Sequence, residues 1–227
     1  MHFLLPILFI LIVLYAPSFW AKAVLSRYSA HRDDIPGTGG ELAFHLLKQF
    51  DMEGIKVEET ALGDHYDPLA KTVRLSPGNM HGKSLTAVAT AAHEVGHAIQ
   101  DQIGYRPLAW RTGLVQVSQK LEKVGSLLVL ATPVLTLLSR APGAGLLTLL
   151  SGICILGGPI LVHLITLPVE INASFDKAMP ILKDGQYVEE QDQKSIQRIL
   201  TACSLTYVAN SLASLLNLWR WVAVLRR

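Results

Sequence analysis

The chain has 227 residues, enough for one ordinary domain or for a small domain with membrane helices, but too few for two large independent domains. Hydrophobic residues make up 50% of the chain and charged residues only 17%, against roughly 25% in soluble domains, which excludes a disordered chain and disfavours a wholly soluble one. The formal net charge of +2 lacks the basic excess that phosphate neutralisation requires, so nucleic acid is not an expected partner.

The chain begins with an apolar segment. Residues 3–20 carry no charged side chain and would reach about 27 Å as a helix, close to the thickness of a bilayer core. We therefore expect an N-terminal transmembrane anchor over residues 1–21. A cleaved signal peptide is the alternative, because Ala21-Lys22-Ala23 resembles a cleavage site, but the preceding region lacks the Lys or Arg that such signals carry.

The polar sequence that follows predicts a helix and a pair of strands. Thr38 is a possible N-cap, and leucines repeat at helical spacing up to Phe50. Residues 55–60 and 71–75 alternate apolar and polar side chains, with turn-forming residues at 63–68 between them. These patterns predict a helix followed by a two-stranded ribbon.

A longer helix is expected from Ser84, which can cap it, to about Gly104, and it contains the motif H-E-x-x-H. The i, i+4 spacing places His93 and His97 on one side of the helix, where both imidazoles can converge on a single zinc ion. Glu94 lies beside them and could take a proton from an activated water and deliver it to a leaving amine. The alternative is two surface histidines and a glutamate on an amphipathic helix.

A catalytic zinc site needs a third protein ligand and one open position. His65, His81, His163 and Glu170 are the candidates. We favour Glu170, because it is the first charged residue after the apolar stretch 145–169. The alternative is that Glu170 is a solvated carboxylate at the membrane interface.

Three apolar stretches occupy the second half of the chain. Residues 124–139 and 145–169 are separated by the turn signal Pro142-Gly143, which predicts a transmembrane helical hairpin over 124–169. Buried core helices are the alternative. The last stretch, 203–227, contains tryptophans and arginines suited to a membrane interface and is predicted to be a fourth span.

The expected fold class is thus a mainly α integral membrane protein with about four transmembrane helices and a small α+β zincin-like domain. That domain covers residues 22–123, and a polar segment over 170–202 supplies the third ligand. Two crossings by the hairpin would return the chain to one face, so both polar regions could build one site. Basic residues predominate on that face, which predicts a multi-pass protein of the cell membrane with a cytoplasmic catalytic domain.

The motif region resembles a known protein family. The segments that carry the likeness are Ala91 to Gln100, His65-Tyr66-Asp67-Pro68, Val73-Arg74-Leu75-Ser76, Pro168-Val169-Glu170 and Leu205 to Ala209. Together they resemble the bacterial membrane-anchored neutral zinc metallopeptidases over most of the chain. The resemblance implies a gluzincin-like site with one Zn²⁺ per chain, ligands His93, His97 and Glu170, and Glu94 as catalytic acid and base.

One residue departs from the wider gluzincin pattern. The third-ligand glutamate is often followed four residues later by an aspartate, where this chain has Ser174. The partner that orients a zinc-bound histidine is therefore in question, and Asp101 is only a weak substitute.

These features predict a membrane-bound zinc endopeptidase that acts at the membrane surface on protein or peptide substrates, including membrane proteins, with the lipid bilayer as a further partner. The strand at 71–75 is expected to pair with an extended substrate. His65, Tyr66 and Tyr207 are candidate donors to a developing oxyanion. The rivals are an intramembrane zinc protease, and a non-catalytic membrane scaffold that binds a structural metal or none. Substrate specificity and oligomeric state cannot be read from the sequence.

Overall fold

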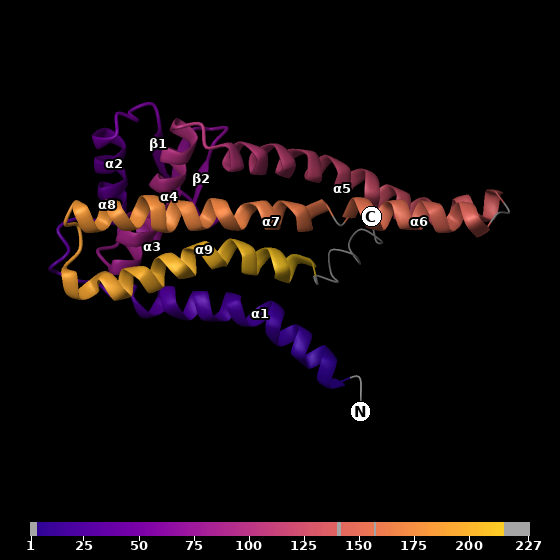
Figure 1. Ribbon diagram of the computed structural model, residues 1–227, viewed down its shortest axis with the longest axis horizontal. Helices are drawn as coiled ribbons and strands as arrows, with labels where there is room; N and C mark the ends of the chain where they lie inside the picture. Colours follow the sequence, from indigo (N-terminus) through magenta and orange to yellow (C-terminus); the bar gives the residue numbers. More distant parts are fainter. Residues whose placement is uncertain (1–3, 140–141, 157, 216–227) are drawn as a thin grey trace.

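The computed structural model describes residues 4–139, 142–156 and 158–215. Its long helices run side by side, with a small unit of short helices and strands packed at one end (Figure 1). The long helices are α1 (Leu4–Arg27), α5 (Arg106–Ser139), α6 (Pro142–Leu156), α7 (Gly158–Ile171) and α9 (Gln193–Leu215). In space α9 lies against both α1 and α7, and α5 lies against α6 and α7.

The small unit begins with α2 (Gly39–Gln49), which the predicted cap at Thr38 starts. The Thr38 hydroxyl accepts from the backbone N–H of Glu41, and the Glu41 carboxylate accepts from the N–H of Thr38, so two of the unpaired donors at the helix start are satisfied. The apolar face of α2 packs onto α4, as the leucine spacing predicts.

A three-stranded sheet follows, with β1 (Lys56–Glu59), β2 (His65–Asp67) and β3 (Thr72–Leu75) in the order β1-β3-β2. The strand β1 pairs in parallel with β3, and β2 pairs antiparallel with it. The predicted two-stranded ribbon is therefore wrong. Part of the expected turn forms β2. Parallel strands such as β1 and β3 cannot be joined by a tight turn, so the chain first forms β2 at one edge of the sheet and then returns to place β3 between β1 and β2.

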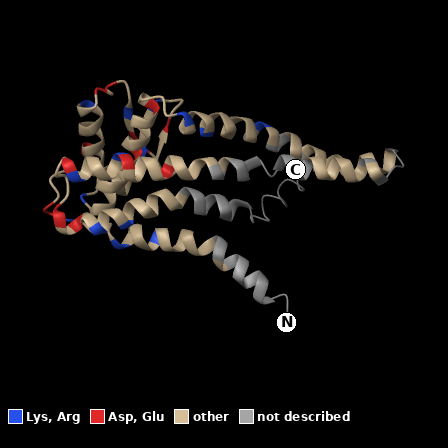
Figure 2. Ribbon diagram, viewed as in Figure 1, with Lys and Arg blue, Asp and Glu red and all other residues tan. Residues whose placement is uncertain are grey.

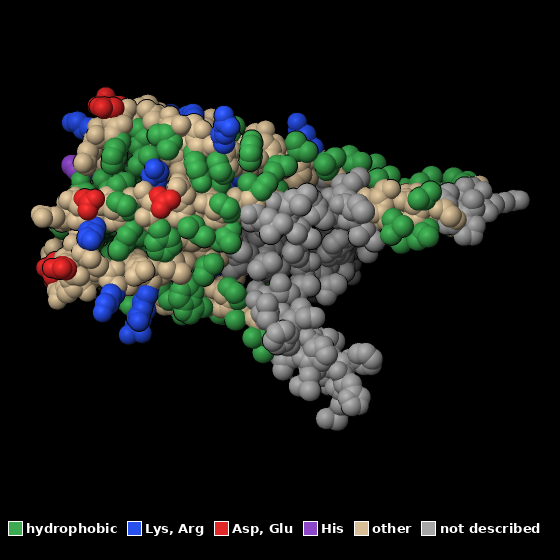
Figure 3. Space-filling model, in the orientation of Figure 1, with side chains coloured by type: hydrophobic (Ala, Val, Ile, Leu, Met, Phe, Trp, Pro, Cys, Tyr) green, Lys and Arg blue, Asp and Glu red, His purple; other side chains and the backbone are tan. Residues whose placement is uncertain are grey.

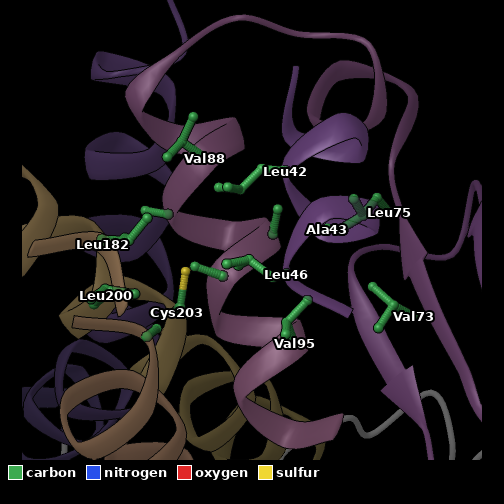
Figure 4. Packing of buried hydrophobic residues seen from close by; sticks show 14 of the residues in the cluster. Leu42, Ala43, Leu46, Val73, Leu75, Val88, Val95, Leu182, Leu200 and Cys203 are labelled. Atoms are coloured by element: carbon green, nitrogen blue, oxygen red, sulfur yellow. The ribbon is translucent and has the colours of Figure 1, made fainter. Parts of the chain in front are cut away.

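After the short helix α3 (Pro77–Met80), α4 (Leu85–Gln102) carries the H-E-x-x-H motif through the centre of the small unit. The Ser84 hydroxyl caps it by accepting from the N–H of Ala87, as predicted. Fifteen of its 18 residues are buried, so it is covered from several sides. Apolar side chains from α2, β3, α8 and α9 gather around it (Figure 4).

The chain returns to α4 through α7 and a π-helical turn, η1 (Asn172–Ala178). The segment continues through α8 (Met179–Asp184) and the 3₁₀ turn η2 (Glu190–Asp192) into α9. The helix α4 and η1 approach closely at Gly96, where an added Cβ would lie 2.7 Å from the carbonyl oxygen of Ala173. This close approach brings the end of α7 beside the motif.

The prediction of about four transmembrane helices is wrong for the part of the chain that the structure describes, because no helix within those ranges is both long and apolar enough to cross a membrane. The expected span at 145–169 is divided between α6 and α7, which have 15 and 14 residues and reach only about 21–23 Å each. The apolar run 124–139 continues a helix that starts at Arg106 and carries charged residues. The predicted C-terminal span lies partly beyond residue 215, outside the described residues.

Charged side chains concentrate at the end of the molecule that holds the small unit (Figure 2). Along α6 and the outer part of α5, which project away from that end, the visible described surface is largely apolar, whereas basic side chains appear on the part of α5 nearer the small unit (Figure 3). Leu127, Leu137 and Leu147 are 67%, 80% and 69% exposed there. The molecule is therefore polarised between a charged end and an apolar helical hairpin.

Candidate metal centre

Two helices bring three candidate ligands to one point. The i, i+4 spacing in α4 stacks His93 and His97 one turn apart, with ring centroids 4.7 Å apart and planes at 77°. Glu170 is the second-to-last residue of α7, and its Oε2 lies 3.2 Å from Nε2 of each histidine. One donor atom from each residue falls within 4.8 Å of the other two, so the three side chains could hold a metal ion.

All three side chains are buried, with exposed fractions of 3% for His93, 5% for His97 and 3% for Glu170. Burial raises the pKa of the Glu170 carboxyl, but the attraction and hydrogen bonding of the adjacent imidazoles lower it by more, so the carboxylate is ionised at neutral pH. A buried carboxylate requires positive charge or donors close to it. The site is thus built around an anion that faces two imidazole nitrogens.

The hydrogen bonding of His97 is compatible with a cation in this space. Its Nδ1 lies 3.0 Å from Oε1 of Gln100, an acceptor, so a neutral His97 carries its proton on Nδ1. Its Nε2 then presents a lone pair to the Oε2 of Glu170, which also carries only lone pairs. Two buried acceptors that face each other need a cation between them, which is either a proton, as in the hydrogen bonds that lower the pKa of Glu170, or a metal ion that also contacts His93.

A serine hydroxyl contacts His93 at the position where the wider gluzincin pattern has an aspartate. The Oγ of Ser174 lies 2.9 Å from Nδ1 of His93, and it also contacts the carbonyl oxygen of Leu200 and the hydroxyl of Ser204. Ser174 therefore takes the orienting position itself. Asp101, the weak substitute considered from the sequence, instead accepts hydrogen bonds from Tyr66 and Lys71, at 2.6 and 2.5 Å.

Glu94 follows His93 on α4 and lies beside the three candidate ligands at the wall of a cleft of about 410 Å³. It is 6% exposed, and burial, opposed in part by His93, raises the pKa of its carboxyl to about 7. The same cleft is lined by His93, His97 and Glu170. A substrate in the cleft would therefore contact both the three-ligand group and the Glu94 carboxylate.

Arg111 of α5 is a cleft residue that the sequence did not single out as part of the site. Its Nη1 lies 3.5 Å from Oε1 of Glu170, the carboxylate oxygen that does not face the histidines. His65 and Tyr66, considered as oxyanion donors, also line the cleft. The Tyr66 hydroxyl already donates its hydrogen bond to Asp101. The His65 ring is oriented by a hydrogen bond that its Nδ1 donates to the carbonyl oxygen of Gly63.

The remaining candidates lie elsewhere. His81 contacts the carboxylate of Glu59 at 2.6 Å, is largely exposed, and is not a member of the three-ligand group. The side chains of His163 and Tyr207 lie outside the described residues. The structure thus brings together the three residues favoured from the sequence, while their binding of metal stays a prediction.

Two comparisons with known proteins find a match. A family model described as "Putative neutral zinc metallopeptidase" matches residues 3–226. The chain is 34% identical over 224 residues to "Putative membrane protease YugP" of Bacillus subtilis (strain 168), with 96% of this chain and 95% of the relative covered. No solved structure shows a significant match to the chain. The chain belongs to the family described as "Putative neutral zinc metallopeptidase".

Proposed function

We propose that the protein is a zinc-dependent endopeptidase that holds one Zn²⁺ per chain through His93, His97 and Glu170. The observation that carries the proposal is the convergence of three buried acceptor atoms on one point in the wall of a cleft, next to the Glu94 carboxylate. A structural zinc site is closed by four protein ligands, whereas a catalytic site keeps one position open. Among the residues that the structure describes, this group has three members, which favours the catalytic type.

Glu94 is the proposed general base and acid. A zinc ion at this centre would supply Lewis acidity to the scissile carbonyl and to the attacking water. The Glu94 carboxylate accepts the proton of that water and transfers it to the leaving amine nitrogen. Its place on α4, directly after His93, holds it in the cleft beside the reacting groups, and the buried surroundings exclude bulk water from the transfer.

An extended peptide is the proposed substrate, and β2 is the strand proposed to bind it. The strand at Thr72–Leu75 was expected to do so, but β3 is paired on both sides, with β1 and with β2. In contrast, β2 is an edge strand, and its residues His65 and Tyr66 line the cleft. Addition of a peptide strand at that edge would draw its backbone past Glu94.

We propose further that the protein acts at a membrane surface. The relative in Bacillus subtilis is named a membrane protease. The apolar surface of α5 and α6, away from the charged end, is suited to contact with lipid (Figure 3). The double change Leu137→Glu and Leu147→Glu is expected to weaken flotation of the protein with phosphatidylglycerol and phosphatidylcholine vesicles. The change Leu69→Glu, at an exposed leucine between β2 and β3, is the control, and equal flotation of all three proteins would contradict the proposal.

The catalytic proposal is tested by the Glu94→Gln variant of the full chain. We expect zinc content to stay at one ion per chain, while hydrolysis of an unfolded model protein falls by about 10²-fold or more, because the base is removed and the ligands are kept. Glu53→Gln, an exposed change of the same kind, is the matched control and should hydrolyse at the wild-type rate. Full hydrolysis by Glu94→Gln, or a wild-type protein without bound zinc, would refute the assignment.

A further inference from the structure

A fully buried glutamine lies behind the candidate metal centre. Gln100 is three residues after His97 on α4, its exposed fraction is 0%, and it faces the junction between α7 and η1. Its amide nitrogen donates to the carbonyl oxygen of Val169 at 2.9 Å and to Oδ1 of Asn172 at 2.8 Å. Its amide oxygen faces Nδ1 of His97 at 3.0 Å.

The orientation of this amide is determined by its neighbours. The carbonyl of Val169 can only accept, so the nitrogen of Gln100 must point to it. Asn172 is oriented as well, because its Nδ2 donates to the carboxylate of Asp176 at 2.6 Å, which leaves its Oδ1 toward Gln100. Both N–H groups of Gln100 are thus used, and only its oxygen remains for His97.

This orientation selects one tautomer of His97. The oxygen of Gln100 accepts, so Nδ1 of a neutral His97 must donate, and the lone pair of the ring is then on Nε2. That lone pair points to the space between His97 and Oε2 of Glu170, which are 3.2 Å apart. At His93, the Ser174 hydroxyl donates to the carbonyl oxygen of Leu200 and therefore accepts from Nδ1, but a hydroxyl can rotate to donate instead, whereas the held amide of Gln100 offers His97 only its oxygen.

We infer that Gln100 is a positioning residue that holds His97 in the tautomer required for metal binding and ties the third ligand to the same helix. The Gln100 side chain contacts the ligand His97 through its oxygen. Through its nitrogen it also bonds to the backbone of Val169, which immediately precedes the ligand Glu170. The inference rests on the proposed zinc centre. It assigns the orienting role at His97 to a neutral amide, where a carboxylate is a common partner of metal-binding histidines.

Zinc affinity is the direct readout, because loss of a residue that orients a ligand costs about 10–100-fold in metal affinity. Gln100→Met keeps the length of the side chain and removes the acceptor and both donors. Gln100→Glu keeps an oxygen for His97 and removes both donors. We expect Gln100→Met to raise the zinc dissociation constant of the full chain, measured by competition with a chelator, by about 10–100-fold. Gln100→Glu keeps the acceptor for His97 but loses the donor to Val169, so we expect it to raise the dissociation constant by less than Gln100→Met.

Gln102→Met is the matched control, since Gln102 is exposed on the same helix, and it should leave the dissociation constant unchanged. A dissociation constant for Gln100→Met within threefold of wild type would overturn the inference. Equal losses in Gln100→Met and Gln100→Glu would show that Gln100 only packs or clamps, which would also overturn it.

A measurement on the wild-type protein covers the case in which neither variant folds. Nitrogen NMR of the zinc-loaded chain with ¹⁵N-labelled histidine should show His97 protonated at Nδ1 and bound through Nε2. Ligation through Nδ1 would contradict the inference. If the wild-type chain binds no zinc, the proposed function fails; if it binds zinc but these comparisons come out negative, the role of Gln100 alone fails.

Discussion

The close approach of α4 and η1 at Gly96 predicts a large effect from a single methyl group. In Gly96→Ala the new Cβ would lie 2.7 Å from the carbonyl oxygen of Ala173 and 3.3 Å from Cβ of Lys177. The first contact is with backbone, so η1 must move for the methyl group to fit. Such overpacking costs about 1–3 kcal/mol. Alanine recovers about 1 kcal/mol in a helix interior, which leaves a net loss of up to about 2 kcal/mol in the free energy of unfolding.

The control is Gly113→Ala in α5, where an added Cβ would meet nothing within 4 Å apart from its chain neighbours and the local backbone of its own helix. This variant should gain only the higher helix propensity of alanine. The difference in the free energy of unfolding between the two variants should therefore equal the cost of overpacking, about 1–3 kcal/mol. Chemical denaturation of both metal-free proteins measures it. Zinc affinity should fall only in Gly96→Ala, because displacement of η1 moves the backbone that follows Glu170. Equal stability and equal zinc affinity of the two variants would refute the reasoning.

Three further changes test other parts of the structure. Thr38→Ala removes the capping box of α2 and should lower the free energy of unfolding by about 1 kcal/mol, measured by denaturation, with no change in zinc affinity. His81→Ala should leave zinc stoichiometry unchanged, since the His81 imidazole bonds to Glu59 and does not belong to the three-ligand group; loss of zinc would restore it as a ligand. The N–H of Ala70 and the Arg74 guanidinium lower the pKa of the Asp67 carboxyl in the folded protein. Ionised Asp67 therefore stabilises the fold at pH values above the unfolded-state pKa of about 3.9, and this stabilisation is lost as the pH falls through the lower pKa of the folded state. The stability difference between wild type and Asp67→Asn should therefore shrink on acidification from pH 7 toward pH 3, and a constant difference would argue against this role.

Local patterns in the sequence predicted the parts of the fold that depend on neighbouring residues. Thr38 and Ser84 cap their helices, and the H-E-x-x-H spacing places both imidazoles together on α4. These features follow from hydrogen bonds and side-chain directions within one or two turns of helix. They need no knowledge of the rest of the chain.

The features that were missed depend on contacts between distant segments. The strand β2 has only three residues, and it is a strand because β3 lies beside it. Gln100 and Arg111 read as ordinary polar residues in the sequence. Their roles appear only when α7 packs beside α4 and α5, and no local pattern indicates that arrangement.

Glu170 was placed beside the histidines for a reason that the structure contradicts. A transmembrane hairpin would return the chain to its starting face, but no described helix is both long and apolar enough to cross a membrane. Glu170 reaches the site because α7 packs beside α9 and continues into η1, which lies against α4 at Gly96. The structure brings the three side chains together, and their binding of metal stays a prediction, while the membrane argument for Glu170 is wrong.

Diffraction from crystals of the zinc-loaded wild-type chain, measured on both sides of the zinc absorption edge, shows whether the three side chains bind zinc. We expect one anomalous peak per chain, in contact with Nε2 of His93, Nε2 of His97 and a carboxylate oxygen of Glu170. A peak that the Glu170 carboxylate does not touch, or no peak at the two histidines, would contradict it.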